Sequence, residues 1–285
     1  MKPNSSFLDL PKNFWASVRL ISQEVGYTEK STRQIKIPAI DEIRSKLEKF
    51  DIDFARLQVQ QTAKGYFGQL LQDYFAYRAD VINVYVEPRL MNVTEAKKIF
   101  KQFYKSLQPS CPIPMNKQKG KMKQPAFLTG LVNMLVEANA NGLPCDYDPH
   151  QLTIVAKDGL PVRTLARRVD GAFPSSVNPI AIWEIKEYYY TTTFGSRVAD
   201  GIYESLLDGL ELEELREHER MDIKHYLIVD AHDTWRKQGK SYLCRIIDML
   251  HMGYIDEALF GREVIERLPD LVHEWVRIYQ SQSRQ

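Results

Sequence analysis

One segment, PIAIWEIKEYYYTTT at residues 179–193, restricts the fold of this chain more than any other. It is rich in β-branched and aromatic residues, which favour strands over helices. Residues two positions apart in a strand point to the same face, so Glu184 and Lys186 are expected to project together. A carboxylate and an ammonium within an apolar strand cost free energy unless a site requires them. The segment therefore predicts a strand that brings two functional charges to one face of a sheet.

The segments around this strand predict a mixed α/β fold, because their apolar spacing changes between the periods of helices and strands. The expected elements, in chain order, are a helix at 126–140, strands at 151–159, 160–173 and 179–193, a helix at 195–220, a strand at 224–231, a turn at 232–240, and helices at 241–254 and 264–280. This order of helix, three strands, helix, strand and helix predicts one α/β core.

The first hundred residues are expected to be mainly helical, because apolar residues recur there at spacings of three and four. Residues 101–125 follow with six lysines, several prolines and no acidic residue, and they predict a largely irregular, basic segment. We therefore expect a helical recognition or assembly region at 1–110 and the α/β core at 111–285.

The composition excludes several classes of protein. A chain of 285 residues is long enough for a large hydrophobic core, and a net charge of +1 argues against a purely electrostatic DNA binder. The three cysteines are far apart, which argues against a zinc site and a disulfide framework. The sequence contains neither a long apolar run nor a signal-like N-terminus, so we expect a cytoplasmic protein without a membrane span.

Three residues have the chemistry that phosphodiester hydrolysis needs. Asp170, expected at the end of the second strand, is one hairpin away from Glu184, so their carboxylates are expected to flank a metal ion. The carbonyl of Ile185 is a further candidate ligand, and Lys186 is placed to hold or polarise the attacking water. The alternative is that Glu184 and Lys186 form an ordinary exposed cross-strand charge pair.

The string Asp170-Gly171 … Glu184-Ile185-Lys186 resembles the active-site motif of the PD-(D/E)XK nuclease superfamily, the fold of many type II restriction endonucleases. By the order of its elements, the resemblance covers residues 125–260. It implies a restriction-endonuclease-like core of a helix, a three-strand meander, a helix and a strand. It also implies a glutamate on the first core helix, where Glu137 is the matching residue. Val169 stands where the family often has proline.

The resemblance implies a Mg2+-dependent deoxyribonuclease, with Mn2+ as a substitute and Ca2+ supporting DNA binding without cleavage. Its substrate would be double-stranded DNA, and cutting both strands would call for a homodimer or a paired nuclease subunit. The favoured role is a sequence-specific type II restriction endonuclease. The alternatives are a nuclease of another phage-defence or DNA-repair system, and a non-catalytic DNA-binding protein.

Three groups of residues are candidates for contacts with DNA. The hydroxyls of Tyr188 and Tyr190, with Arg197 in the next helix, are placed to bind phosphates, although the tyrosines equally suit a core. The lysines of the basic segment suit a DNA backbone or a solvated loop. A segment near residue 30 loosely resembles a helix-turn-helix unit, with a plain helical bundle as the alternative. The lysines are Lys117, Lys119, Lys121 and Lys123, and the groove-facing candidates are Arg33, Gln34 and Lys36.

Overall fold

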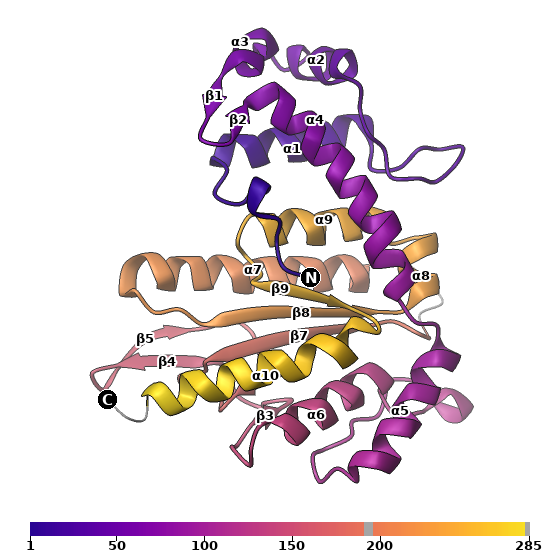
Figure 1. Ribbon diagram of the computed structural model, residues 1–285, viewed down its shortest axis with the longest axis vertical. Coiled ribbons are helices and arrows are strands. Elements are labelled where there is room, and N and C mark those ends of the chain that lie inside the picture. Colours follow the sequence, from indigo (N-terminus) through magenta and orange to yellow (C-terminus); the bar gives the residue numbers. More distant parts are fainter. Residues whose placement is uncertain (191–195, 283–285) are drawn as a thin grey trace.

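The structure, a computed structural model, describes residues 1–190 and 196–282, without the side chains of Lys121, Ser196 and Arg197. A five-stranded sheet lies at its centre with helices on both faces (Figure 1). The α-helices are α1 (Lys12–Val25), α2 (Ile40–Glu48), α3 (Phe54–Val59), α4 (Phe67–Asp80), α5 (Val93–Leu107), α6 (Phe127–Asn139), α7 (Ser196–Glu219), α8 (His232–Lys237), α9 (Lys240–His251) and α10 (Glu263–Gln282). Short 3-10 helices are η1 (Ser5–Phe7), η3 (Glu87–Arg89) and η4 (Gly120–Met122), and η2 (Val81–Val86) is a π-helix.

The central sheet has the strand order β3-β6-β7-β8-β9, and the other strands form two small hairpins. The strands are β1 (Gln61–Thr62), β2 (Gly65–Tyr66), β3 (Asp146–Tyr147), β4 (Ile154–Lys157), β5 (Leu160–Thr164), β6 (Gly171–Phe173), β7 (Ala181–Glu187), β8 (Lys224–Asp230) and β9 (Glu257–Phe260). Strand β6 is antiparallel to β7, whereas β7, β8 and β9 are parallel to one another. The mixed α/β fold predicted from the sequence is thereby confirmed.

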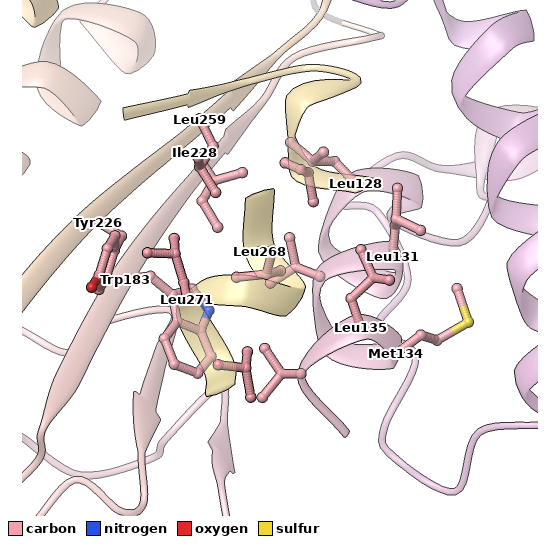
Figure 2. Packing of buried hydrophobic residues seen from close by; sticks show 14 of the residues in the cluster. Leu128, Leu131, Met134, Leu135, Trp183, Tyr226, Ile228, Leu259, Leu268 and Leu271 are labelled. Carbon is pink, nitrogen blue, oxygen red and sulfur yellow. The ribbon is translucent and has the colours of Figure 1, made fainter. Parts of the chain in front are cut away.

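One face of the sheet packs against α6 and α10. Trp183 of β7 and Tyr226 of β8 lie on this face beside Leu131 of α6 and Leu271 of α10 (Figure 2). Trp183 also stacks on Trp275 of α10, with the ring centroids 5.5 Å apart. Large aromatic side chains bury much apolar surface, so this layer is a major source of stability for the core.

The opposite face of the sheet packs against α7 and α9. Leu227 and Val229 of β8 lie in one buried cluster with Ile202 of α7 and Ile246 of α9. Because side chains alternate along a strand, Glu184 and Lys186 of β7 also project to this face. The strand register predicted from the sequence is therefore confirmed.

The N-terminal helices α1, α2 and α4 enclose a separate apolar cluster that includes Phe14, Ile43 and Phe67. Figure 1 shows these helices stacked beside α9. A buried ion pair crosses this boundary, with Arg78 Nη1 of α4 3.0 Å from Asp248 Oδ1 of α9. Helix α5, in contrast, packs on α6.

Four local expectations were wrong. The first hundred residues were expected to be mainly helical from their apolar spacing, but the β1-β2 hairpin interrupts the helical pattern between α3 and α4, where Gly65 has a positive φ. The strand expected at 160–173 is divided between β5 and β6, which belong to different sheets. The turn expected at 232–240 contains α8, which Trp235 anchors in the core. Strand β9, at 257–260, was not expected, since a run of four residues is too short to show a distinctive period.

No helix within the described ranges is both long and apolar enough to cross a membrane.

Candidate active site

Asp170 lies at the bend that leads into β6. Its backbone N–H donates to the Trp183 carbonyl over 3.1 Å, and its Oδ2 accepts from the Ile185 N–H over 2.7 Å. These two bonds place the Asp170 carboxylate beside Glu184 on the neighbouring strand. The expectation that Asp170 ends a strand was wrong, because β6 begins at Gly171. A Cβ at Gly171 would lie 2.2 Å from the Trp183 indole, so only glycine fits this crossing.

Glu184 and Lys186 lie in the middle of β7, and both are buried, with side chains 0% and 7% exposed. Lys186 Nζ donates to Glu184 Oε2 over 2.8 Å. The second carboxylate oxygen of Glu184 lies 2.8 Å from Arg167 Nη1. The alternative of an exposed cross-strand pair is therefore wrong, since this pair is enclosed and reinforced by a second cation.

Helix α7 contributes two acids that the sequence interpretation missed. Glu204 Oε2 accepts from Lys186 Nζ over 3.0 Å, and Asp208 Oδ2 accepts from Arg167 Nη1 over 2.7 Å. Their spacing of four residues puts both carboxylates on the helix face that covers β7. Gly201, one turn earlier, leaves room for the Lys186 side chain, because a Cβ at this position would lie only 3.1 Å from Lys186 Cδ.

Negative charge dominates this cluster. Four carboxylates (Asp170, Glu184, Glu204 and Asp208) face the two cations Arg167 and Lys186, which gives a net charge of −2 when all six groups are ionised.

The pKa values of the cluster reflect this excess of negative charge. Burial and the neighbouring Glu184 charge raise the pKa of Asp170 to about 6, and the same two causes raise the pKa of Asp208 to about 7. Although burial opposes it, the nearby cations Lys186 and Arg167 lower the pKa of Glu184. The Glu184 carboxylate overcomes burial to raise the pKa of Lys186 above its usual value, so this amine stays protonated.

The cluster meets the charge requirement of a divalent cation, which would offset the net −2 charge. Asp208 Oδ1 is buried without a hydrogen-bond partner, whereas Glu184 Oε1 is already in charge contact with Arg167 Nη1. The N–H and C=O of a strand residue point the same way, so the Ile185 carbonyl points toward Asp170.

In the described part of the chain, no three His, Cys, Asp or Glu side chains converge to hold a metal by themselves. Two carboxylates, a carbonyl and several waters form a donor set typical of Mg2+. Asp170, Glu184 and Ile185 could supply the protein part of such a set.

Glu137 does not join this cluster. It lies on α6, which covers the sheet face opposite to Glu184, and its carboxylate accepts from the Ser110 N–H at 3.1 and 3.2 Å. The assignment of Glu137 to the catalytic group was therefore wrong. Instead, the first turn of α6 is held by Glu187, whose Oε2 accepts from the Thr129 N–H over 2.8 Å.

Tyr188 and Tyr190, which follow β7, pack in different apolar layers on opposite faces of the sheet. Tyr188 packs on Trp235, with ring centroids 5.6 Å apart, in the layer of α7 and α9. Tyr190 packs on the layer of α6 and α10. The two rings therefore do not form one phosphate-binding row. The side chain of Arg197 lies outside the described residues.

The basic segment lies directly before α6. Lys117, Lys119 and Lys123 are exposed there, in a loop closed by a bridge between Met115 and Pro125, while the side chain of Lys121 is not described. Their expected contact with a DNA backbone stays a prediction.

The candidates for groove contacts do not lie on a helix. They occupy the loop between α1 and α2, which a bridge between Thr28 and Ile35 closes. Arg33 donates to the Lys237 carbonyl and Lys36 pairs with Glu42, while Gln34 is exposed. The expectation of a recognition helix carrying Arg33, Gln34 and Lys36 was therefore wrong.

The fold and the buried site define an α/β protein with a carboxylate-rich centre at the meeting of β6, β7 and α7. The chain belongs to the family described as a domain of unknown function (DUF7687), which matches residues 91–275. Residues 1–85 match a second domain of unknown function (DUF7690). No curated protein and no solved structure matches the chain. Arg167, Asp170, Glu184 and Lys186 fall within the first match.

Proposed function

We propose that this chain is a Mg2+-dependent deoxyribonuclease that hydrolyses DNA phosphodiester bonds. The observation that carries the proposal is the buried contact of Lys186 with Glu184, next to Asp170 at the bend before the adjoining strand. A buried ion pair contributes little net stability compared with well-packed apolar residues, so stability alone is a poor reason for these charges. A phosphodiester hydrolase, in contrast, needs carboxylates for a cation and a fixed positive charge near the phosphate.

The roles of the residues follow from their charges. Asp170 and Glu184 would hold the cation together with the Ile185 carbonyl, and a bound Mg2+ supplies activation of water and charge neutralisation. Lys186 stays protonated, so it donates hydrogen bonds to the attacking water or the phosphate and does not act as a base. Arg167 balances Glu184 and Asp208 and keeps the carboxylates in place.

The bond changes of the proposed reaction are those of hydrolysis. The oxygen of a water forms a bond to phosphorus while the bond from phosphorus to the 3′ oxygen breaks. The leaving oxygen takes up a proton, and the products carry a 5′-phosphate and a 3′-hydroxyl. The phosphate would approach past Arg167 and Glu204, whose side chains are 22% and 42% exposed.

Plasmid digestion tests this proposal. Purified protein is incubated with supercoiled plasmid and Mg2+, Mn2+, Ca2+ or EDTA, and the products are separated and their ends mapped. We expect nicked or linear DNA with Mg2+ and Mn2+, and intact DNA with Ca2+ and EDTA. DNA that binds in every condition but is never cut would replace the proposal with a non-catalytic DNA-binding protein.

The product pattern distinguishes between biological roles. A sequence-specific type II restriction endonuclease, the role favoured by the resemblance in the motif, would give discrete bands. A homodimer would then pair two centres on opposite strands of a palindromic site. A smear would favour a nuclease of another phage-defence or DNA-repair system.

A pH prediction follows from Asp170, whose pKa is raised to about 6. A protonated carboxyl must lose its proton to bind a cation, so Ca2+ affinity should fall about tenfold per pH unit below about 6. The sign for stability is opposite to that of an ordinary salt-bridged acid. A raised carboxyl pKa stabilises the metal-free fold at low pH, and this contribution is lost as pH rises from about 4 to about 6.

Calorimetric Ca2+ titrations of the DNA-free protein between about pH 5 and pH 8 check this prediction. Asp170→Asn should remove the inflection, whereas Asp222→Asn, at an exposed ion pair, should retain it. An affinity that does not vary with pH would contradict the assignment of Asp170 as a cation ligand.

A further inference from the structure

A second site lies outside the carboxylate centre, in a cleft between the N-terminal helices and the core. The cleft has a volume of about 490 Å³ and lies between α1, α7 and α9, with Tyr27 of the following loop at its rim. Figure 1 shows α1 beside α9, at the boundary between the N-terminal helices and the sheet layer. Volumes of roughly 300 to 1,000 Å³ are typical of small-molecule sites, which often lie between structural units.

Two arginines give the cleft a positive charge. Neither Arg19 nor Arg245 has a carboxylate within ion-pair distance among the residues that the structure describes. The acid on the lining, Asp248, is neutralised by the buried Arg78. An arginine head group without an acidic partner is suited to bind an anion, and phosphate matches its fork of donors best.

The setting of Arg245 adds aromatic surfaces to this charge. Its guanidinium lies 5.5 Å from the ring centre of Tyr27 and 5.7 Å from that of Tyr203. Arg245 Nη1 donates to the Tyr203 hydroxyl over 2.7 Å, which leaves that hydroxyl proton free to donate to a ligand. Tyr203 is 52% exposed, although aromatic residues usually bury their rings. Planar bases stack on exposed aromatic side chains of this kind.

The apolar lining completes the pattern. Ile202 and Leu206 of α7 and Met249 of α9 form a wall next to the two arginines. A site with an apolar wall, aromatic rims and two cations suits a ligand that combines a planar ring with a phosphate. Inorganic phosphate lacks the ring, and an apolar molecule lacks the charge.

We propose that this cleft binds a nucleoside monophosphate unit, with its phosphate on Arg19 and Arg245 and its base against Tyr203 and Tyr27. The unit has two possible sources, a free nucleotide or one unpaired nucleotide of a nucleic-acid strand. The proposal does not depend on the nuclease reaction, because none of the lining residues belongs to the carboxylate centre.

Calorimetric titrations in EDTA test this site while the carboxylate centre has no cation. The probes are AMP, GMP, CMP and dTMP, with adenosine, inorganic phosphate and a single-stranded DNA hexamer as separate arms. We expect at least one monophosphate or the hexamer to bind more tightly than phosphate or adenosine. Binding of the monophosphates assigns a free nucleotide, and binding of the hexamer alone assigns a nucleic-acid strand.

Variants locate the binding in the cleft. Arg245→Gln should weaken it roughly 10- to 100-fold, as expected for a lost hydrogen bond to a charged group. Tyr203→Ala removes an exposed ring and should weaken it about tenfold without unfolding the protein. Leu206→Trp should block the cleft while both arginines remain. The control is Arg277→Gln, which removes an exposed arginine of α10 on the other side of the sheet.

Two results would overturn the proposal. One is the absence of binding by every monophosphate and the hexamer at millimolar concentration, in a protein whose circular dichroism shows a folded state. The other is binding that Arg245→Gln, Tyr203→Ala and Leu206→Trp all leave unchanged. Either result leaves the nuclease proposal intact, since plasmid cleavage is measured separately.

Discussion

Glu184→Gln is expected to lower Mg2+-dependent DNA cleavage roughly a thousandfold or more. The substitution keeps the shape of the side chain but removes the charge that would hold the cation between Asp170 and the Ile185 carbonyl. A metal ion contributes several kcal/mol to the transition state of phosphoryl transfer, and each 1.4 kcal/mol is a tenfold change in rate. Single-turnover cleavage of a plasmid, with DNA binding measured in Ca2+, checks this expectation.

The matched control is Glu137→Gln, the same substitution on the opposite face of the sheet. Glu137 contacts Ser110 and takes no part in the carboxylate cluster, so its variant should cut within about threefold of the parent protein. Asp170→Asn and Lys186→Met should behave like Glu184→Gln. Substantial cleavage by folded Glu184→Gln, or loss of cleavage in Glu137→Gln, would contradict the proposed site.

Asp248→Asn is expected to destabilise the protein by about 3–5 kcal/mol, the usual cost of removing one partner of a buried ion pair. Arg78 is 1% exposed, and its Nη1 lies 3.0 and 3.1 Å from the two oxygens of Asp248. Tyr74 also donates to Asp248 Oδ1 over 2.6 Å, so the substitution disturbs two donors at once. Urea denaturation followed by circular dichroism measures the change.

Two further variants test whether burial of the ion pair causes the loss of stability in Asp248→Asn. Asp222→Asn makes the same chemical change at an exposed pair with Arg216, and we expect it to cost about 1 kcal/mol or less. The double variant Arg78→Met/Asp248→Leu removes both charges and should recover much of the lost stability. A loss in Asp248→Asn as small as that in Asp222→Asn would show that the pair does not hold the N-terminal helices to the core.

The sequence was sufficient to predict β7 and its register, because alternating side chains in an apolar strand leave few arrangements. Glu184 and Lys186 therefore appear on one face, with Trp183 and Ile185 on the other. Asp170 was placed correctly beside Glu184 although its strand was not, because the short connection allowed only neighbouring strands.

The two acids of α7, Glu204 and Asp208, could not be predicted from the sequence. That helix carries acidic residues along much of its length, so nothing in its period distinguishes Glu204 and Asp208 from the solvated acids. Arg167 comes just before Asp170, so the sequence does place it near this site, but its contacts with Glu184 and Asp208 depend on the path of the connection between β5 and β6. Glu137 was misplaced for a related reason, since the order of elements does not specify which face of the sheet a helix covers.

The buried pair of Arg78 and Asp248 has a consequence for how this chain can be recombined. Arg78 lies in the part matched by one family and Asp248 in the part matched by the other. A chimera that joins either part to an unrelated counterpart would leave one charge enclosed without its partner. Each part therefore restricts which partner it can be joined to. We expect recombination to be tolerated only when the joined parts carry both Arg78 and Asp248, or neither of them.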